Sequence, residues 1–301
     1  MKKFHKFCVG TIMVLFSLIL IWLLVLSGFS TSFISPDGYE HTYLVKDSIA
    51  LNLLVAAVVF FVCYFLKEKT KLGIWFEKIE KEELLYEKCK RILLLVILAL
   101  GVLWVLFTQC IPRADQDSVL LAAWGLKVGD YHMFEKSGYL AAFPHQSGLV
   151  LLLYLCSFLF GDYNYVAFQL MNAVFIMLTY RELEKISGYF GVKKVTRLAV
   201  LLCGILFFPL ILYASFVYGM VPGLFWAVLS MRDTIAFCRE QHIKQAVIAA
   251  VSIMFAVMLK SNYLIFFIGI SVYLFLDLLK QKKVRYVCLI VCMVILCMGQ
   301  S

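Results

Sequence analysis

Apolar stretches of about 15 to 20 residues recur along the whole of this 301-residue chain. A helix of about 20 residues is long enough to cross a hydrocarbon core of about 30 Å. Hydrophobic residues make up 63% of the sequence and charged residues only 16%, which is too apolar for a water-soluble domain of this size. Because a bilayer offers no water to the backbone, helices are the default. The sequence therefore predicts an all-α, polytopic membrane protein.

The amino-terminal 30 residues combine a basic head, MKKFHK, with an apolar run. This run is longer than the hydrophobic region of a usual secretory signal peptide. It predicts an uncleaved signal anchor, and a cleaved signal peptide is the alternative.

The net charge of +9 raises the question of nucleic-acid binding. The lysines and arginines, however, cluster in the short loops after every second apolar run, which is the positive-inside pattern of membrane proteins and not a basic binding face. The pattern places the amino terminus in the cytoplasm, and no nucleic-acid partner is expected. The lysine-rich segment 67–91 then lies on the cytoplasmic side, where we expect an amphipathic surface helix.

The apolar run GLVLLLYLCSFLF, residues 148–160, decides the topology. If it crossed the membrane, three basic loops further along the chain would lie outside, against the positive-inside rule. It is also short for a span, so we expect an interfacial or re-entrant helix on the outer side. About nine spans then remain, at residues 12–28, 49–66, 92–109, 165–181, 198–215, 219–236, 245–260, 262–280 and 285–299.

The stretch IPRADQDSVLLAAWGLKVGDY, residues 111–131, follows the third predicted span and holds two aspartates close together. The part after the aspartates predicts an amphipathic helix on the outer surface, ended by Gly129. Its buried face would carry four small or apolar residues, Val119, Ala122, Ala123 and Leu126. Asp115 and Asp117 can act as a general base, bind a metal or solvate the end of a loop, and their spacing alone leaves these roles open.

Beyond this stretch, few polar residues are expected inside or beside the predicted spans. Gln169 and Asn172, three residues apart in a span, predict hydrogen bonds between helices, with contact to a ligand as the alternative. Tyr218 and Gly219 mark an outer turn, either the rim of a cavity or a plain hairpin.

The order of elements from residue 92 to about 280 resembles the GT-C superfamily of membrane glycosyltransferases, and in particular the bacterial members similar to glycosyltransferase family 39. The segments that carry the resemblance are PRADQDSVLLAAWGLKVGDY, GYLAAFPHQSGLVLLLYLCSFLFGDYNYVAFQLMNAVFIMLTYRELEKISG and MLKSN. The resemblance implies a GT-C-like core over 92–301, preceded by two leading spans and a basic loop over 1–91. Since members of the superfamily usually continue with more spans, we expect a truncated or minimal form.

The resemblance also implies the acidic residue of the catalytic centre. Asp115 matches that position, with Asp117 as the second choice. Gln116 stands where many members have a second acidic residue, and this departure disfavours a metal. His145 and Gln146 follow Pro144 where many members have a double proline.

Sugar transfer from a lipid phosphate requires a base for the acceptor hydroxyl and polar or cationic groups for the departing phosphate. An aspartate at neutral pH is ionised and can serve as the base. The predicted substrate-binding residues are Arg113, Gln116, His145, Gln146, Lys260 and Asn262. Lys260 near the end of a span favours such a role, while snorkelling to lipid phosphates is the alternative.

The sequence thus predicts a multi-pass plasma-membrane glycosyltransferase with its active site on the outer face. Its partners would be a polyprenyl-phosphate sugar, an extracytoplasmic glycan, lipid or protein acceptor, and the lipid bilayer. No cofactor is expected, and a divalent metal is unsupported. The alternatives are a multi-pass transporter or lipid flippase and an envelope-polymer assembly protein. A transporter would require charges near the bilayer midplane, whereas the predicted spans carry their charges at the ends.

Overall fold

The computed structural model describes residues 2–34, 42–68, 71–281 and 283–298, which form helices joined by loops and one β-hairpin. The chain divides into two compact units, Met1–Lys81 and Glu82–Ser301. The all-α prediction is confirmed for the described residues except for that hairpin.

The first unit contains two long apolar helices, a hairpin between them and a shorter helix. The elements are α1 (Lys2–Phe29), β1 (Ser30–Ile34), β2 (Thr42–Lys46), α2 (Ile49–Glu68) and α3 (Lys71–Lys81). The strands pair antiparallel, with Ser30 opposite Lys46. Helix α3 confirms a separate helix in the lysine-rich segment, and only Glu82 separates it from the next helix.

The second unit begins at α4 and holds all the predicted site residues. Its α-helices are α4 (Glu83–Thr108), α5 (Asp115–Val128), α6 (Tyr139–Ala142), α7 (Ser147–Phe160), α8 (Tyr165–Tyr189), α9 (Lys194–Leu206), α10 (Phe208–Leu212), α11 (Met220–Glu240), α12 (Ile243–Leu259), α13 (Leu264–Gln281) and α14 (Val284–Met298). Four short 3-10 turns, η1 (His132–Phe134), η2 (Pro144–Gln146), η3 (Tyr213–Ser215) and η4 (Ser261–Tyr263), join some of them.

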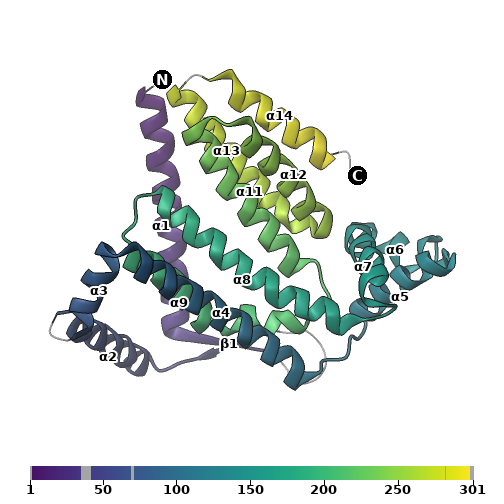
Figure 1. The fold of residues 1–301 in the computed structure, drawn as a ribbon, viewed down its shortest axis with the longest axis horizontal. Coiled ribbons are helices and arrows are strands. Elements are labelled where there is room, and N and C mark those ends of the chain that lie inside the picture. Colours follow the sequence, from purple (N-terminus) through teal and green to yellow (C-terminus); the bar gives the residue numbers. More distant parts are fainter. Residues whose placement is uncertain (1, 35–41, 69–70, 282, 299–301) are drawn as a thin grey trace. The chain divides into compact units, whose positions relative to one another are not determined.

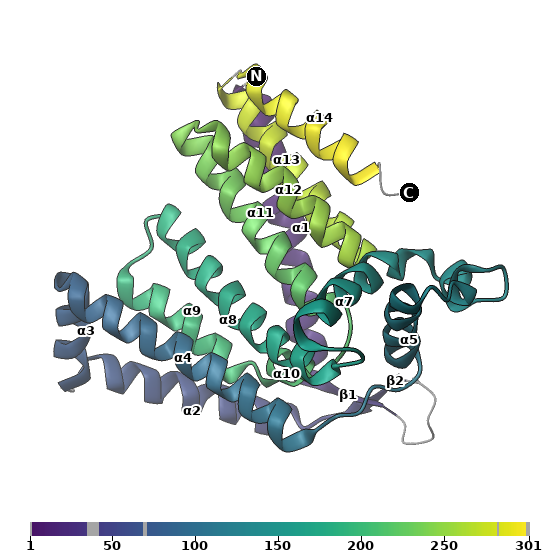
Figure 2. The same ribbon diagram turned by 45° about the vertical axis from the view of Figure 1, so that its right-hand side comes forward.

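Two groups of helices share α11 in this unit. Helices α11, α12, α13 and α14 lie side by side around a buried core that includes Ile253, Leu274 and Met293 (Figures 1 and 2). Helix α8 packs on α11 from the other side and also contacts α4 and α9. The contact with α4 is close, because a Cβ added to Gly101 would stand 2.8 Å from the Cβ of Ala173. Small residues at helix contacts are typical of membrane bundles.

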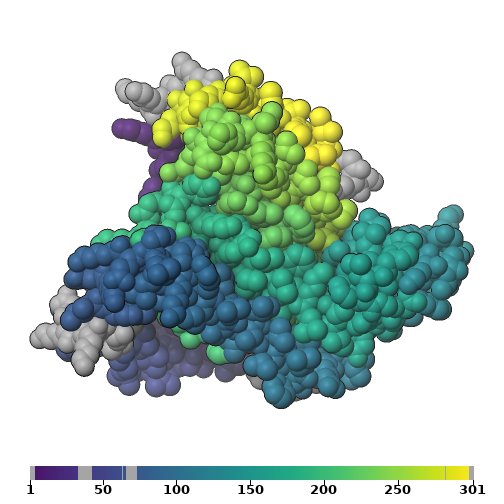
Figure 3. All heavy atoms as spheres, in the orientation of Figure 1, coloured from purple at the N-terminus to yellow at the C-terminus, as the bar shows by residue number. Residues whose placement is uncertain are grey.

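Helices α5, α6 and α7 form a lobe that projects beside the other helices of this unit, and its core also includes Phe168 of α8 and Val217 (Figure 3). Helix α5 confirms the predicted surface helix: it ends at Gly129, whose φ is +79°. The side chains predicted to be buried are Val119, Ala122 and Ala123, which are buried, and Leu126, which is partly buried. Both aspartates lie in the first turn of α5, where the helix dipole favours negative charge.

Four described helices are long and apolar enough to cross a membrane: Phe4–Phe29, Glu83–Thr108, Met220–Glu240 and Ser261–Gln281. Two bent pairs, 132–160 and 194–215, raise the number to six if each is one span. The pair at 132–160 bends by 104°, as a broken span or a re-entrant loop would. These helices are consistent with a membrane protein, while the count of nine stays a prediction.

The span predicted at 198–215 is bent in the structure. Helices α9 and α10 meet there at 57°. Pro209 in the first turn of α10 has no N–H to continue the ladder of α9, so the chain breaks at Phe207. The bend redirects the chain into the turn that carries Tyr218.

Candidate functional site

Two buried amides on α8 hold the segments that lead into the predicted site. The side-chain amide of Gln169 donates to the carbonyls of Cys110 at 2.8 Å and Ser215 at 2.6 Å. That of Asn172 donates to the carbonyls of Ala214 at 3.2 Å and Phe216 at 2.8 Å. The predicted hydrogen bonds from these two residues are confirmed. They fix the chain just before Asp115 and just before Tyr218.

Two glycines bring further segments against the end of α12. A Cβ on Gly148 would stand 2.0 Å from the carbonyl oxygen of Met258, and one on Gly219 would stand 1.9 Å from that of Leu259. Only glycine permits such close backbone approach. The start of α7 and the turn before α11 therefore both lie beside Lys260.

The structure places Asp115 and Lys260 on either side of Tyr218. The Tyr218 hydroxyl donates to Oδ2 of Asp115 at 3.0 Å. The Lys260 ammonium lies 5.5 Å from the centre of the Tyr218 ring, within the range of a cation–π contact. Tyr218 thus contacts both a carboxylate, through its hydroxyl, and a cation, through its ring.

Next to Asp115 lie two buried polar groups, the Tyr139 hydroxyl and the Gln146 side chain. Burial and then the Asp115 charge raise the pKa of Tyr139 to about 12, and Gln146 is only 3% exposed. The Tyr139 hydroxyl interacts with both Asp115 and Gln146. The Gln146 side-chain oxygen makes no hydrogen bond among the described residues. Since buried polar groups are normally paired, this oxygen is a candidate to contact a ligand. Tyr139 was not predicted from the sequence, because its position on a four-residue helix gave no reason to choose it.

The backbone immediately before Asp115 is strained. Ala114 has φ +50° and ψ −123°, a conformation that residues with a Cβ rarely adopt. Strain of this kind costs about 1–3 kcal/mol and is concentrated at functional sites. It sets the direction in which Asp115 enters α5.

The second aspartate lies in a different environment. The Tyr163 hydroxyl, from the loop that follows α7, donates a hydrogen bond to Asp117. Gln116 uses its side-chain oxygen to accept from the backbone amide of Val217 at 2.8 Å. Gln116 therefore ties α5 to the turn of Tyr218, and Asp117 ties it to the loop after α7.

Three other predicted residues lie exposed, namely Arg113, His145 and Asn262. Their side chains make no hydrogen bond or ion pair among the residues that the structure describes, although the His145 ring lies 6.1 Å from that of Phe143. The structure thus brings together Asp115, Gln146 and Lys260. It leaves Arg113, His145 and Asn262 available to solvent or substrate. In the described ranges, no three His, Cys, Asp or Glu side chains are grouped as a metal site would require.

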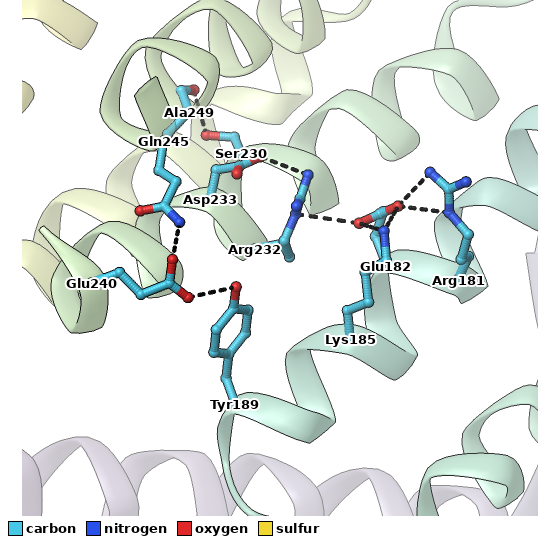
Figure 4. A network of polar contacts seen from close by, with 10 residues as sticks. All are labelled: Arg181, Glu182, Lys185, Tyr189, Ser230, Arg232, Asp233, Glu240, Gln245 and Ala249. Atoms are coloured by element: carbon cyan, nitrogen blue, oxygen red, sulfur yellow. Dashed lines mark hydrogen bonds and ion pairs between the residues drawn. The ribbon is translucent and has the colours of Figure 1, made fainter. Parts of the chain in front are cut away.

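A second constellation of charges lies between α8 and α11 (Figure 4). Glu182 is fully buried and forms ion pairs with Arg181 at 2.7 Å, Lys185 at 3.0 Å and Arg232 at 3.2 Å. Arg232 also pairs with the buried Asp233 at 2.9 Å. These charges lie in the carboxy-terminal parts of α8 and α11, which continue beyond the ends predicted for the two spans. That the charges of the spans sit at their ends stays a prediction.

No family model matches the chain, and no curated protein or solved structure matches it.

Proposed function

We propose that the protein is a membrane glycosyltransferase that moves a sugar from a polyprenyl-phosphate donor to an extracytoplasmic cell-envelope glycan, lipid or protein. The observation that carries the proposal is the contact of Tyr218 with Asp115 on one side and Lys260 on the other. The transfer requires a base and a phosphate-stabilising cation at the same place without mutual neutralisation. The order of elements that resembles the GT-C superfamily supports the same reading.

In the proposed reaction, Asp115 accepts the proton of the acceptor hydroxyl. The acceptor oxygen then forms a bond to the anomeric carbon while the bond from that carbon to the phosphate oxygen breaks, with inversion. The polyprenyl phosphate leaves with the electron pair, and Lys260 stabilises its negative charge. Arg113 and His145, which are exposed on the same lobe, are available to the phosphate and sugar.

Asp117 takes the second place as a base because its partner is Tyr163 and not Tyr218, the tyrosine that Lys260 faces. The bonds of Gln116 make it a residue that positions Asp115 and Tyr218 through the backbone. Asn262 lies on the same turn as Lys260 and is assigned a weaker part in substrate binding.

The experiment measures donor turnover by membranes that carry the full chain. Radiolabelled polyprenyl-phosphate glucose, mannose and galactose are supplied, and loss of label from the lipid is followed. Asp115→Asn should lower the rate about 100-fold or more. Asp130→Asn is the matched control, since Asp130 pairs with His132 at the far end of the same helix, and it should stay near the wild-type rate. Near-normal turnover by Asp115→Asn, at equal protein level, would contradict the assignment; no turnover of any donor by the wild type would contradict the function.

A transporter is the second candidate, favoured by the buried charges of Glu182 and Asp233 inside α8 and α11. Ionisable residues within membrane helices often mark an ion or substrate path. Here three cations surround Glu182, an arrangement that a structural clamp explains. Donor turnover that depends on Asp115 but not on an ion gradient would favour the transferase over the transporter.

A further inference from the structure

An apolar groove lies between α8, α11 and α13, away from Asp115. Its volume is about 490 Å³, within the usual range of ligand pockets. Its walls include Ile186 of α8 and Phe190 directly after it, Met231 and Ile235 from α11, and Ile270 from α13. These apolar side chains offer contacts to a hydrocarbon chain.

The two main walls of the groove are joined by side chains of α8 and α11. Glu182 pairs with Arg232, and the Tyr189 hydroxyl donates to Glu240 at 3.4 Å (Figure 4). Both contacts bridge the helices beside the groove, so its width is set before any ligand enters. A preformed groove loses less ordering entropy when it binds a chain.

One polar side chain within the groove lacks a partner. Thr234 is 1% exposed and lines the groove, and its hydroxyl makes no hydrogen bond to any described residue. On α8, by contrast, Thr179 and Ser187 donate to the carbonyls four residues back, at 2.8 and 3.0 Å. The Thr234 hydroxyl is therefore free to donate to an ester carbonyl of a bound molecule.

A cation lies at the mouth of the groove. The guanidinium of Arg239 lies 6.0 Å from the ring centre of Phe190, one of the lining residues. Arg239 is exposed, and no carboxylate lies within ion-pair distance of it in the described part of the chain. In the predicted topology this end of α11 faces the cytoplasm, where the leaflet carries anionic lipid.

We propose that the groove binds an acyl chain of an anionic phospholipid, with its phosphate at Arg239 and an ester carbonyl at Thr234. The site is separate from the proposed transferase site and does not depend on it. The apolar walls match the chain of such a lipid, the Thr234 hydroxyl matches its ester and the Arg239 guanidinium matches its phosphate.

The test uses the full-length protein, delipidated in detergent and examined by native mass spectrometry with added phosphatidylglycerol or phosphatidylcholine. Gly269 lines the groove, and a Cβ there meets nothing within 4 Å, so Gly269→Leu should fill the groove without disturbing the fold. Gly10→Leu, on α1, is the matched control because a Cβ there also meets open space. We expect Gly269→Leu to lose one tightly bound phosphatidylglycerol and Gly10→Leu to keep it.

Arg239→Gln tests the headgroup contact and should weaken phosphatidylglycerol binding roughly fivefold. Arg285→Gln, which removes another exposed arginine, should leave it unchanged. Equal binding by the wild type and Gly269→Leu at an unchanged melting temperature would overturn the proposal. Equal binding of phosphatidylglycerol and phosphatidylcholine, with no effect of Arg239→Gln, would also overturn it. Retention of added polyprenyl phosphate in preference to phosphatidylglycerol would overturn it as well.

Discussion

Replacing Tyr218 by phenylalanine isolates the contact on which the proposed chemistry depends. The substitution removes the hydroxyl that donates to Asp115 at 3.0 Å and keeps the ring that Lys260 faces. A hydrogen bond to a charged group contributes about 1.5–3 kcal/mol. If that whole energy holds Asp115 in its reactive position, the turnover rate falls roughly 10- to 150-fold, since each 1.36 kcal/mol corresponds to about a tenfold change.

The assay is donor turnover at saturating and limiting donor. We expect the loss in kcat, with KM little changed, because the hydroxyl positions the base and does not touch the lipid. Tyr163→Phe is the matched control: it removes the hydroxyl that donates to Asp117, and it should stay within about twofold of the wild type. An unchanged rate in Tyr218→Phe, or an equal fall in both variants, would refute the assignment of Asp115 as the base.

Three further changes test the supports of the site, each by chemical denaturation of the purified protein. Gln169→Leu should lower the free energy of unfolding by about 1–3 kcal/mol, because it leaves two carbonyls without their donor. Glu182→Gln should cost about 3–5 kcal/mol, since it leaves three cations near one neutral amide. Gly219→Ala should cost about 1–3 kcal/mol and slow turnover, since the added Cβ forces the Leu259 carbonyl away. Unchanged unfolding energies in these variants would contradict the packing described here.

Local patterns in the sequence were enough to predict α5. Its apolar face and the glycine that ends it depend on neighbours within one or two turns, and such short-range signals are readable from sequence. The helical class followed in the same way from the length of the apolar runs. The hairpin of β1 and β2 was missed, although the sequence Pro36-Asp37-Gly38, a typical turn signal, lies between its two strands.

The ends of helices α8 and α11 were harder to predict. The charges of RELEK, residues 181–185, and of Arg232 and Asp233 resemble the start of cytoplasmic loops. The positive-inside rule predicts such loops there. In the structure each helix continues, because Glu182 gathers the cations of both helices into one buried cluster. Such compensation depends on partners far apart in the sequence and leaves no local pattern.

The members of the candidate site were found one by one, but their contacts were not. Asp115, Gln146 and Lys260 were each chosen from sequence, whereas Tyr139 was not, and Tyr218 was considered only as a rim or a turn. Two glycines that pack against the end of α12, Gly148 and Gly219, and the side-chain amides of α8 bring these residues together. A single sequence cannot show which segments such residues approach.

The most direct measurement of the central claim is labelling of single cysteines by a membrane-impermeant maleimide in sealed cells, with and without added polyprenyl-phosphate sugar. In a background without native cysteines, Gln146→Cys and Lys260→Cys should label from outside, and the donor should protect both. Phe190→Cys, at the end of α8, should label only after the membrane is opened. Labelling of position 190 from outside, or of position 260 only after opening, would contradict an outer-face site for a lipid-borne sugar.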